Sequence, residues 1–142
     1  LSLRHPLDCV LSSWMQNFKL NSAMINMCDL NKTIDFYCKT MEFYKLCNKR
    51  YKNQTHIIRY EDLVDDFEGQ IKKLLSFMDL SWEKSLKQYE KTATQRDLIN
   101  TPSYSQVIKP IYKSSRYRWK NYKSYLNNYK NIIDPWLKEY GY

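Results

Sequence analysis

Apolar residues recur at helical spacing in four parts of the chain. Positions three and four apart share one face of an α-helix, so such a pattern predicts an amphipathic helix with one buried face. The four stretches are 7–18, about 33–50, 71–78 and 119–140, and a shorter one at 82–89 follows Ser81 as a candidate N-cap. We expect Pro135 to break or kink the last helix.

Two short apolar runs have the character of β-strands. Leu1–Leu3 leads into Arg4-His5-Pro6, and His56–Tyr60 is a β-branched run bounded by polar residues. Pro6 suits the first turn of a helix, and Asp8 would lie where the helix dipole favours a negative charge. The order strand, helix, helix, strand, helices indicates one α/β domain, in which a right-handed crossover makes the strands parallel.

Composition narrows the class of partner. The 142 residues carry a formal net charge of +8, which favours nucleic acid, an acidic membrane surface or a phosphorylated small molecule. None of the four cysteines forms a C-x-x-C pair, so we expect no metal site and a reducing, cytoplasmic compartment. No apolar run reaches the length of a membrane span.

The ends of the two strands hold the first candidate site residues. Ligands of open parallel sheets bind beyond the carboxyl ends of the strands. Arg4 ends the first strand just before a helix N-terminus, where backbone N–H groups and a guanidinium suit a phosphate, and the Ser12 hydroxyl offers another donor. The alternative is a structural arginine and a surface serine. Tyr60 ends the second strand and can stack on a base, before a polar turn at Glu61-Asp62.

A third cluster, Lys113–Trp119, precedes the last helix. It combines cations, hydroxyls and a flat indole ring, which suit phosphate and adenine recognition. A solvated basic segment is the alternative. A rival function also remains, because the basic, tyrosine-rich stretch Lys109–Lys130 fits a nucleic-acid-binding module that contacts backbones and stacks bases.

Four motifs in order resemble a known family. Arg4-His5-Pro6-x-Asp8-x-x-x-Ser12 resembles the motif with which sulfotransferases hold the 3′-phosphate of 3′-phosphoadenosine 5′-phosphosulfate (PAPS). Arg59-Tyr60-Glu61-Asp62-Leu63 is similar to a stretch that follows a core strand in that family. The remaining two resemble the C-terminal signature and ending of a bacterial branch, which is related to tyrosylprotein sulfotransferases and often follows tetratricopeptide repeats. They are Thr101–Val107 with Ile111-Tyr112 and Arg118-Trp119, and Trp136–Tyr142.

The resemblance implies a P-loop-like three-layer fold and transfer of a sulfuryl group from PAPS to a hydroxyl. The acceptor stays open among carbohydrate, peptide tyrosine and small molecules; nucleic acid and metal are not expected. Its implied cofactor-binding residues are Arg4 and Ser12 on the 3′-phosphate, Tyr60 near the adenine, and Ser103, Ser115 and Arg118 closing the site. His5 has a structural role. The family often has glycine before the Arg-Trp pair, where this chain has Tyr117.

The same resemblance implies that two parts of the active site lie outside this chain. The family's Gly/Ser/Thr-rich 5′-phosphosulfate loop and its catalytic base, a Glu or His, precede the Arg-x-Pro motif, and no segment here matches that loop. We therefore expect residues 1–142 to be the C-terminal part of a single sulfotransferase domain, mostly helical with a few parallel strands and inactive in isolation. Upstream tetratricopeptide repeats fit the same interpretation.

Overall fold

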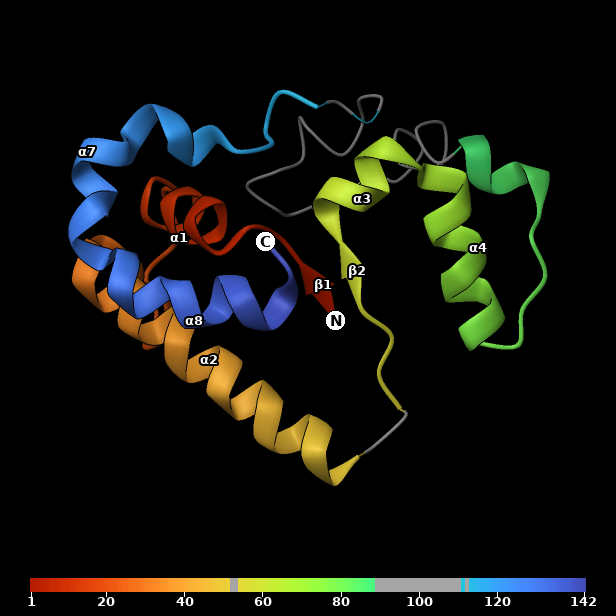
Figure 1. Ribbon diagram of the computed structural model, residues 1–142, viewed down its shortest axis with the longest axis horizontal. Helices are drawn as coiled ribbons and strands as arrows, with labels where there is room; N and C mark the ends of the chain where they lie inside the picture. The colour runs from red at the N-terminus through yellow and green to blue at the C-terminus, as the bar shows by residue number, and fades with distance from the viewer. Residues whose placement is uncertain (52–53, 89–110, 112) are drawn as a thin grey trace. The chain divides into compact units, whose positions relative to one another are not determined.

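The computed structural model describes residues 1–51, 54–88, 111 and 113–142. The chain divides into two compact units. Figure 1 shows its helices and strands. The first unit consists of Leu1–Ser2 and His56–Ser114, and the second consists of Leu3–Thr55 and Ser115–Tyr142. The described residues are mostly helical, with one short two-stranded sheet. None of the helices in the described ranges combines the length and the apolar character needed to cross a membrane.

The sheet pairs the two predicted strands. β1 (Ser2–Leu3) lies beside β2 (Ile58–Arg59), and the two run parallel, as the crossover predicts. The backbone N–H of Ile58 donates to the carbonyl of Leu1 over 2.9 Å, and the amino group of Leu1 donates to the carbonyl of His56 over 2.6 Å. Both strands are only two residues long, shorter than their apolar runs.

Helices follow β2 directly in the first unit. α3 (Tyr60–Asp65) begins where the sequence predicts a polar turn at Glu61-Asp62, so that prediction is wrong. The Glu61 side chain is buried, and Asp62 pairs with Arg59 over 2.8 Å, which stabilises the first turn of α3. α4 (Phe67–Phe77) overlaps the third predicted helix, 71–78, but begins four residues earlier. The predicted fourth helix is a 3-10 turn, η2 (Lys84–Gln88).

The second unit begins with α1 (Pro6–Trp14), close to its predicted range but ending at Trp14. Pro6 occupies its first turn, and the buried residues recur at helical spacing. A 3-10 turn, η1 (Met24–Cys28), leads to α2 (Leu30–Arg50), which starts three residues earlier than predicted. Asp29 caps α2 by accepting a hydrogen bond from the N–H of Lys32 over 2.9 Å, and this cap explains the earlier start.

The predicted last helix is divided into four pieces. They are η3 (Arg118–Tyr122), α7 (Lys123–Leu126), η4 (Asn127–Tyr129) and α8 (Lys130–Tyr140). α8 continues through Pro135, so of the expected break or kink at this proline the break is wrong and the kink stays a prediction. The regular helix is interrupted at η4 instead. Pro135 and Asn131, one turn before it, are both exposed, so water can satisfy the Asn131 carbonyl that the proline leaves without its helical donor.

The core of the second unit joins its first two helices to its C-terminal segment. Five buried side chains form one cluster: Leu7, Val10, Ile34, Leu126 and Ile133. A second cluster contains Leu3, Met41 and Trp136. Polar contacts also join α2 to the C-terminal segment, including an ion pair between Lys45 and Glu139 over 3.1 Å. Burial of these apolar faces therefore brings 115–142 against the start of the chain.

Candidate functional site

The Arg4 side chain joins the start of the second unit to Ser115. Arg4 lies between β1 and α1, and its Nη2 donates a hydrogen bond to the carbonyl oxygen of Ser115 over 2.6 Å. The two residues are 111 positions apart in the chain. Packing has thus brought together two residues that the sequence predicts for one site. Arg4 is half-buried, so water competes less effectively for its hydrogen bonds than at a fully exposed position.

Asp8 makes a second link to the same C-terminal segment. Its carboxylate is 1% exposed, and Oδ1 accepts a hydrogen bond from the backbone N–H of Trp119 over 2.7 Å. This N–H belongs to the first turn of η3, and the Asp8 carboxylate supplies it with an acceptor from outside that turn. The sequence predicts Asp8 only as a favourable charge in the first turn of α1. The sequence did contain a signal for such a partner. Asp8 lies three residues before the buried Leu11, and this spacing places an acidic side chain on the apolar face of α1.

His5 packs among three aromatic rings. Its imidazole is buried and stacks on the Trp119 ring, with 5.0 Å between centroids and 21° between planes. Tyr117 and Tyr142 approach it edge-on at 5.7 Å and 5.2 Å. These contacts agree with the structural role expected of His5, because they fix the C-terminal segment against the turn that enters α1.

Tyr117 occupies the position where the family often has glycine. Its φ is 53° and its ψ is 29°, in the left-handed region. That conformation brings Cβ close to the backbone in every residue except glycine. This chain therefore holds a tyrosine in a conformation that glycine adopts without strain.

The other predicted site residues are less closely joined. Ser12 is exposed on α1, four residues after Asp8 and hence on the same side of the helix. Arg118 is exposed at the start of η3, and its side chain has no hydrogen bond or ion pair within the described ranges. Tyr60 is the half-buried first residue of α3 in the other unit, so its association with Arg4 stays a prediction. Ser103 lies outside the described residues.

A thiol adjoins this site. Burial raises the pKa of Cys9, the nearby Arg4 charge acts in the opposite direction, and the Asp8 carboxylate adds to the rise. The side chain is therefore a neutral thiol at neutral pH, without nucleophilic character. No group of three or more His, Cys, Asp or Glu side chains in the described part of the chain is placed to hold a metal ion.

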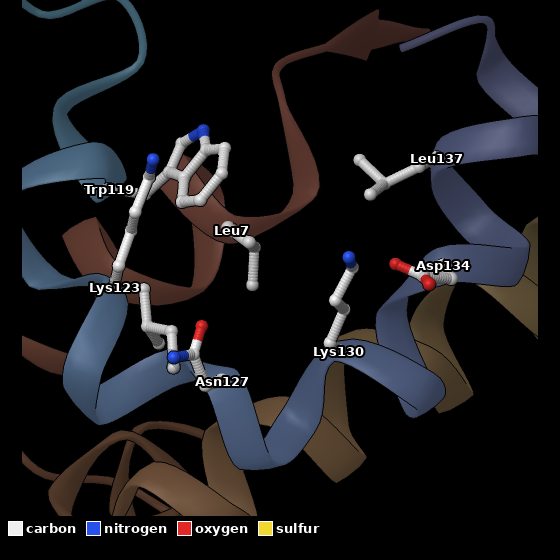
Figure 2. Close-up of a pocket in the computed structure, with 8 residues that line it drawn as sticks. Leu7, Trp119, Lys123, Asn127, Lys130, Asp134 and Leu137 are labelled. Carbon is white, nitrogen blue, oxygen red and sulfur yellow. The ribbon is translucent and has the colours of Figure 1, made fainter.

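A pocket of about 250 Å³ lies in the second unit, with the Trp119 ring in its wall (Figure 2). Its lining is apolar at Leu7, Trp119, Leu126 and Leu137, and polar at Lys123, Asn127, Lys130 and Asp134. The pocket is lined by Trp119, from the predicted cluster Lys113–Trp119, but not by Arg4, Ser12, Tyr60, Ser115 or Arg118. The indole thus has two environments, since it stacks on His5 and also borders the pocket.

The protein family of this chain follows from its match to a family model. The model of the sulfotransferase family matches residues 1–84, more than half of the chain. The chain belongs to the sulfotransferase family. The match contains the Arg4–Ser12 and Arg59–Leu63 motifs, so the resemblance found in the sequence is confirmed at the level of the family.

Curated relatives agree with this sulfotransferase assignment. Cytosolic sulfotransferase 15 of Arabidopsis thaliana is 23% identical to this chain over 94% of its residues. Cytosolic sulfotransferase 14 of the same plant is 24% identical over 80% of them. An uncharacterized protein of Aquifex aeolicus is 29% identical over 96% of it. The alignments cover only 39%, 35% and 19% of these relatives, respectively, so the chain spans well under half the length of each. No solved structure matches the chain.

Proposed function

We propose that the full-length protein transfers a sulfuryl group from PAPS to a hydroxyl acceptor, and that this chain holds the 3′-phosphate and adenosine end of the donor. The observation that carries the proposal is the sulfotransferase family match over residues 1–84, which contains Arg4, Ser12 and Tyr60. The acceptor is a carbohydrate, a peptide tyrosine or a small alcohol.

The geometry around Arg4 supports the 3′-phosphate assignment. Arg4 lies two residues before α1, a nine-residue helix whose N-terminus has the positive end of the helix dipole. A phosphate at this position would receive charge-assisted hydrogen bonds, which are about twice as strong as neutral ones. Ser12 and Ser115 add hydroxyl donors and Arg118 adds a second guanidinium. Tyr60 contributes on the adenine side, and Ser103 is included on the resemblance alone.

The remaining catalytic parts belong to the rest of the protein. In this proposal residues 1–142 are the C-terminal part of one P-loop-like domain, while the 5′-phosphosulfate loop and the catalytic base precede residue 1. Sulfuryl transfer, like phosphoryl transfer, depends on positioning and on stabilisation of developing charge, so both parts are needed for turnover. Membership of the bacterial branch, tetratricopeptide repeats and a cytoplasmic location stay predictions.

Calorimetric titration of the full-length protein with 3′-phosphoadenosine 5′-phosphate (PAP) tests the proposal. Hydrogen bonds to charged groups contribute about 1.5–3 kcal/mol, so Arg4→Ala is expected to weaken PAP binding roughly tenfold to a hundredfold. Arg50→Ala is the matched control, because Arg50 is an exposed arginine in the last turn of α2. Equal affinity of the Arg4→Ala variant and the unmodified protein would contradict the assignment.

A further inference from the structure

We propose that Asp8 is a positioning residue for the 3′-phosphate site, which acts on Arg4 through residues 115–119. The inference rests on the proposed function, and it concerns a residue that touches no part of the phosphate. Asp8 would act by holding the segment whose Ser115 carbonyl orients the Arg4 guanidinium.

The Asp8 carboxylate is placed to hold this segment firmly. It is 1% exposed and accepts the Trp119 N–H over 2.7 Å, a short charge-assisted hydrogen bond in a dry environment. It lies in the first turn of α1, where the helix dipole favours its negative charge, and it accepts from the backbone of η3. A neutral side chain of the same size would lose about half of this interaction.

Arg4 and Asp8 together hold both ends of the five-residue segment. Arg4 contacts the carbonyl of Ser115, while Asp8 contacts the N–H of Trp119. The turn between them contains Tyr117 in its left-handed conformation, and His5 stacks on the Trp119 ring. When Asp8 is replaced, the Trp119 end is released and the Ser115 carbonyl loses its fixed place. The Arg4 guanidinium, which donates to that carbonyl, then loses the orientation that a phosphate requires.

A purely structural role for Asp8 predicts a different outcome. Loss of stability alone would lower the folded fraction and would weaken every ligand equally. Loss of positioning would weaken the contact with the 3′-phosphate selectively. PAP carries this phosphate and AMP lacks it, so the ratio of their affinities isolates the 3′-phosphate contact.

The experiment measures PAP and AMP binding to the full-length protein by calorimetry, at a temperature where circular dichroism shows each variant folded. Arg4→Ala, Asp8→Ala, Asp8→Asn and Thr33→Ala are compared. Thr33 is the matched control, because it too is a 1%-exposed polar side chain in the same unit and bonds only to backbone carbonyls, those of Asn26 and Asp29. We expect Asp8→Ala to reduce the preference for PAP over AMP roughly tenfold. In metal sites, removal of a side chain that orients a ligating residue lowers the affinity about 10–100-fold, and tenfold is the lower end of that range. Asp8→Asn retains an acceptor and is expected to lose less.

Each outcome decides between the hypotheses. Loss of the PAP preference in Asp8→Ala, with the preference kept in Thr33→Ala, supports positioning. If Arg4→Ala loses the preference and Asp8→Ala keeps it, the positioning role is wrong while the proposed function stands. If Arg4→Ala itself keeps the preference, the 3′-phosphate assignment fails and this inference fails with it. If Asp8→Ala and Thr33→Ala lose it equally, the loss is not specific to Asp8 and the inference is overturned. Should Asp8→Ala fail to fold, an unchanged preference in Asp8→Asn overturns it.

Discussion

Tyr117 permits a direct measurement of the conformational cost in the turn before η3. A residue other than glycine in the left-handed region costs about 1–2 kcal/mol. Two contacts of the ring offset this cost by a similar amount: its edge contact with His5 at 5.7 Å, about 0.5–1.5 kcal/mol, and the Lys120 Nζ at 4.6 Å from its centroid, about 0.5–1 kcal/mol. Tyr117→Ala removes these contacts and keeps the conformational cost. Tyr117→Gly removes the contacts and the cost together.

At most positions in a helix or strand an alanine variant is more stable than a glycine variant. At position 117 we expect the opposite order of stability. Glycine lowers the stability by about 0.5–1 kcal/mol, because its unfolded chain has more conformational freedom. It also removes the cost of the left-handed conformation, about 1–2 kcal/mol. Tyr117→Gly should therefore be more stable than Tyr117→Ala by about 1 kcal/mol. Urea unfolding followed by tryptophan fluorescence gives the free energies of unfolding. Asn121, exposed in η3 with a negative φ, is the control position, where alanine should be more stable than glycine. The reasoning is refuted if Tyr117→Ala equals or exceeds Tyr117→Gly in stability.

Two further predictions concern other parts of the chain. Thr33→Val should reduce the free energy of unfolding by about 1 kcal/mol, because its buried hydroxyl donates over 2.8 Å to Asp29, whereas Thr33→Ser should retain that bond; urea unfolding compares the two. Hydrogen bonds from Lys72 and Lys87 lower the pKa of Glu68 to about 2, from 4.5, so its contribution to stability is complete above pH 4.5 and is lost as the pH falls towards 2. NMR titration of the carboxyl carbon checks this value. Lys87→Gln should raise it, and an unchanged pKa in that variant would show that Lys87 has no part in the shift.

Local pattern was sufficient where a helix has both an apolar face and a boundary signal. α1 was predictable because Pro6 marks its start and its buried residues recur at helical spacing. α3 was missed because its buried Glu61 has the appearance of a turn residue, and burial of an acid depends on partners that periodicity does not reveal. The division of the last helix was not predicted either, because apolar residues recur at helical spacing on both sides of η4.

The site was predictable in part, and for a different reason. The resemblance placed Arg4 and Ser115 in one site, and the structure joins them through the main chain of Ser115. The link from Asp8 to the Trp119 N–H could not be found in this way, because a backbone donor leaves no side-chain signature. Only the acid on the apolar face of α1 indicated that such a partner was needed.

The span of the contacts at Arg4 and Asp8 has a consequence for biosynthesis. Both hydrogen bonds close loops of 111 residues, and the entropic cost of closing such a loop has a length-dependent part of about 4 kcal/mol. Ribosomes add about 5–20 residues per second, so roughly 6–20 s pass between synthesis of Asp8 and of Trp119. During this interval α1 and α2 can pack together through Val10 and Ile34. The Asp8 carboxylate can accept its hydrogen bond only after the Trp119 N–H has been synthesised. The turn at residues 115–119 is thus completed only after α1 and α2 have been synthesised.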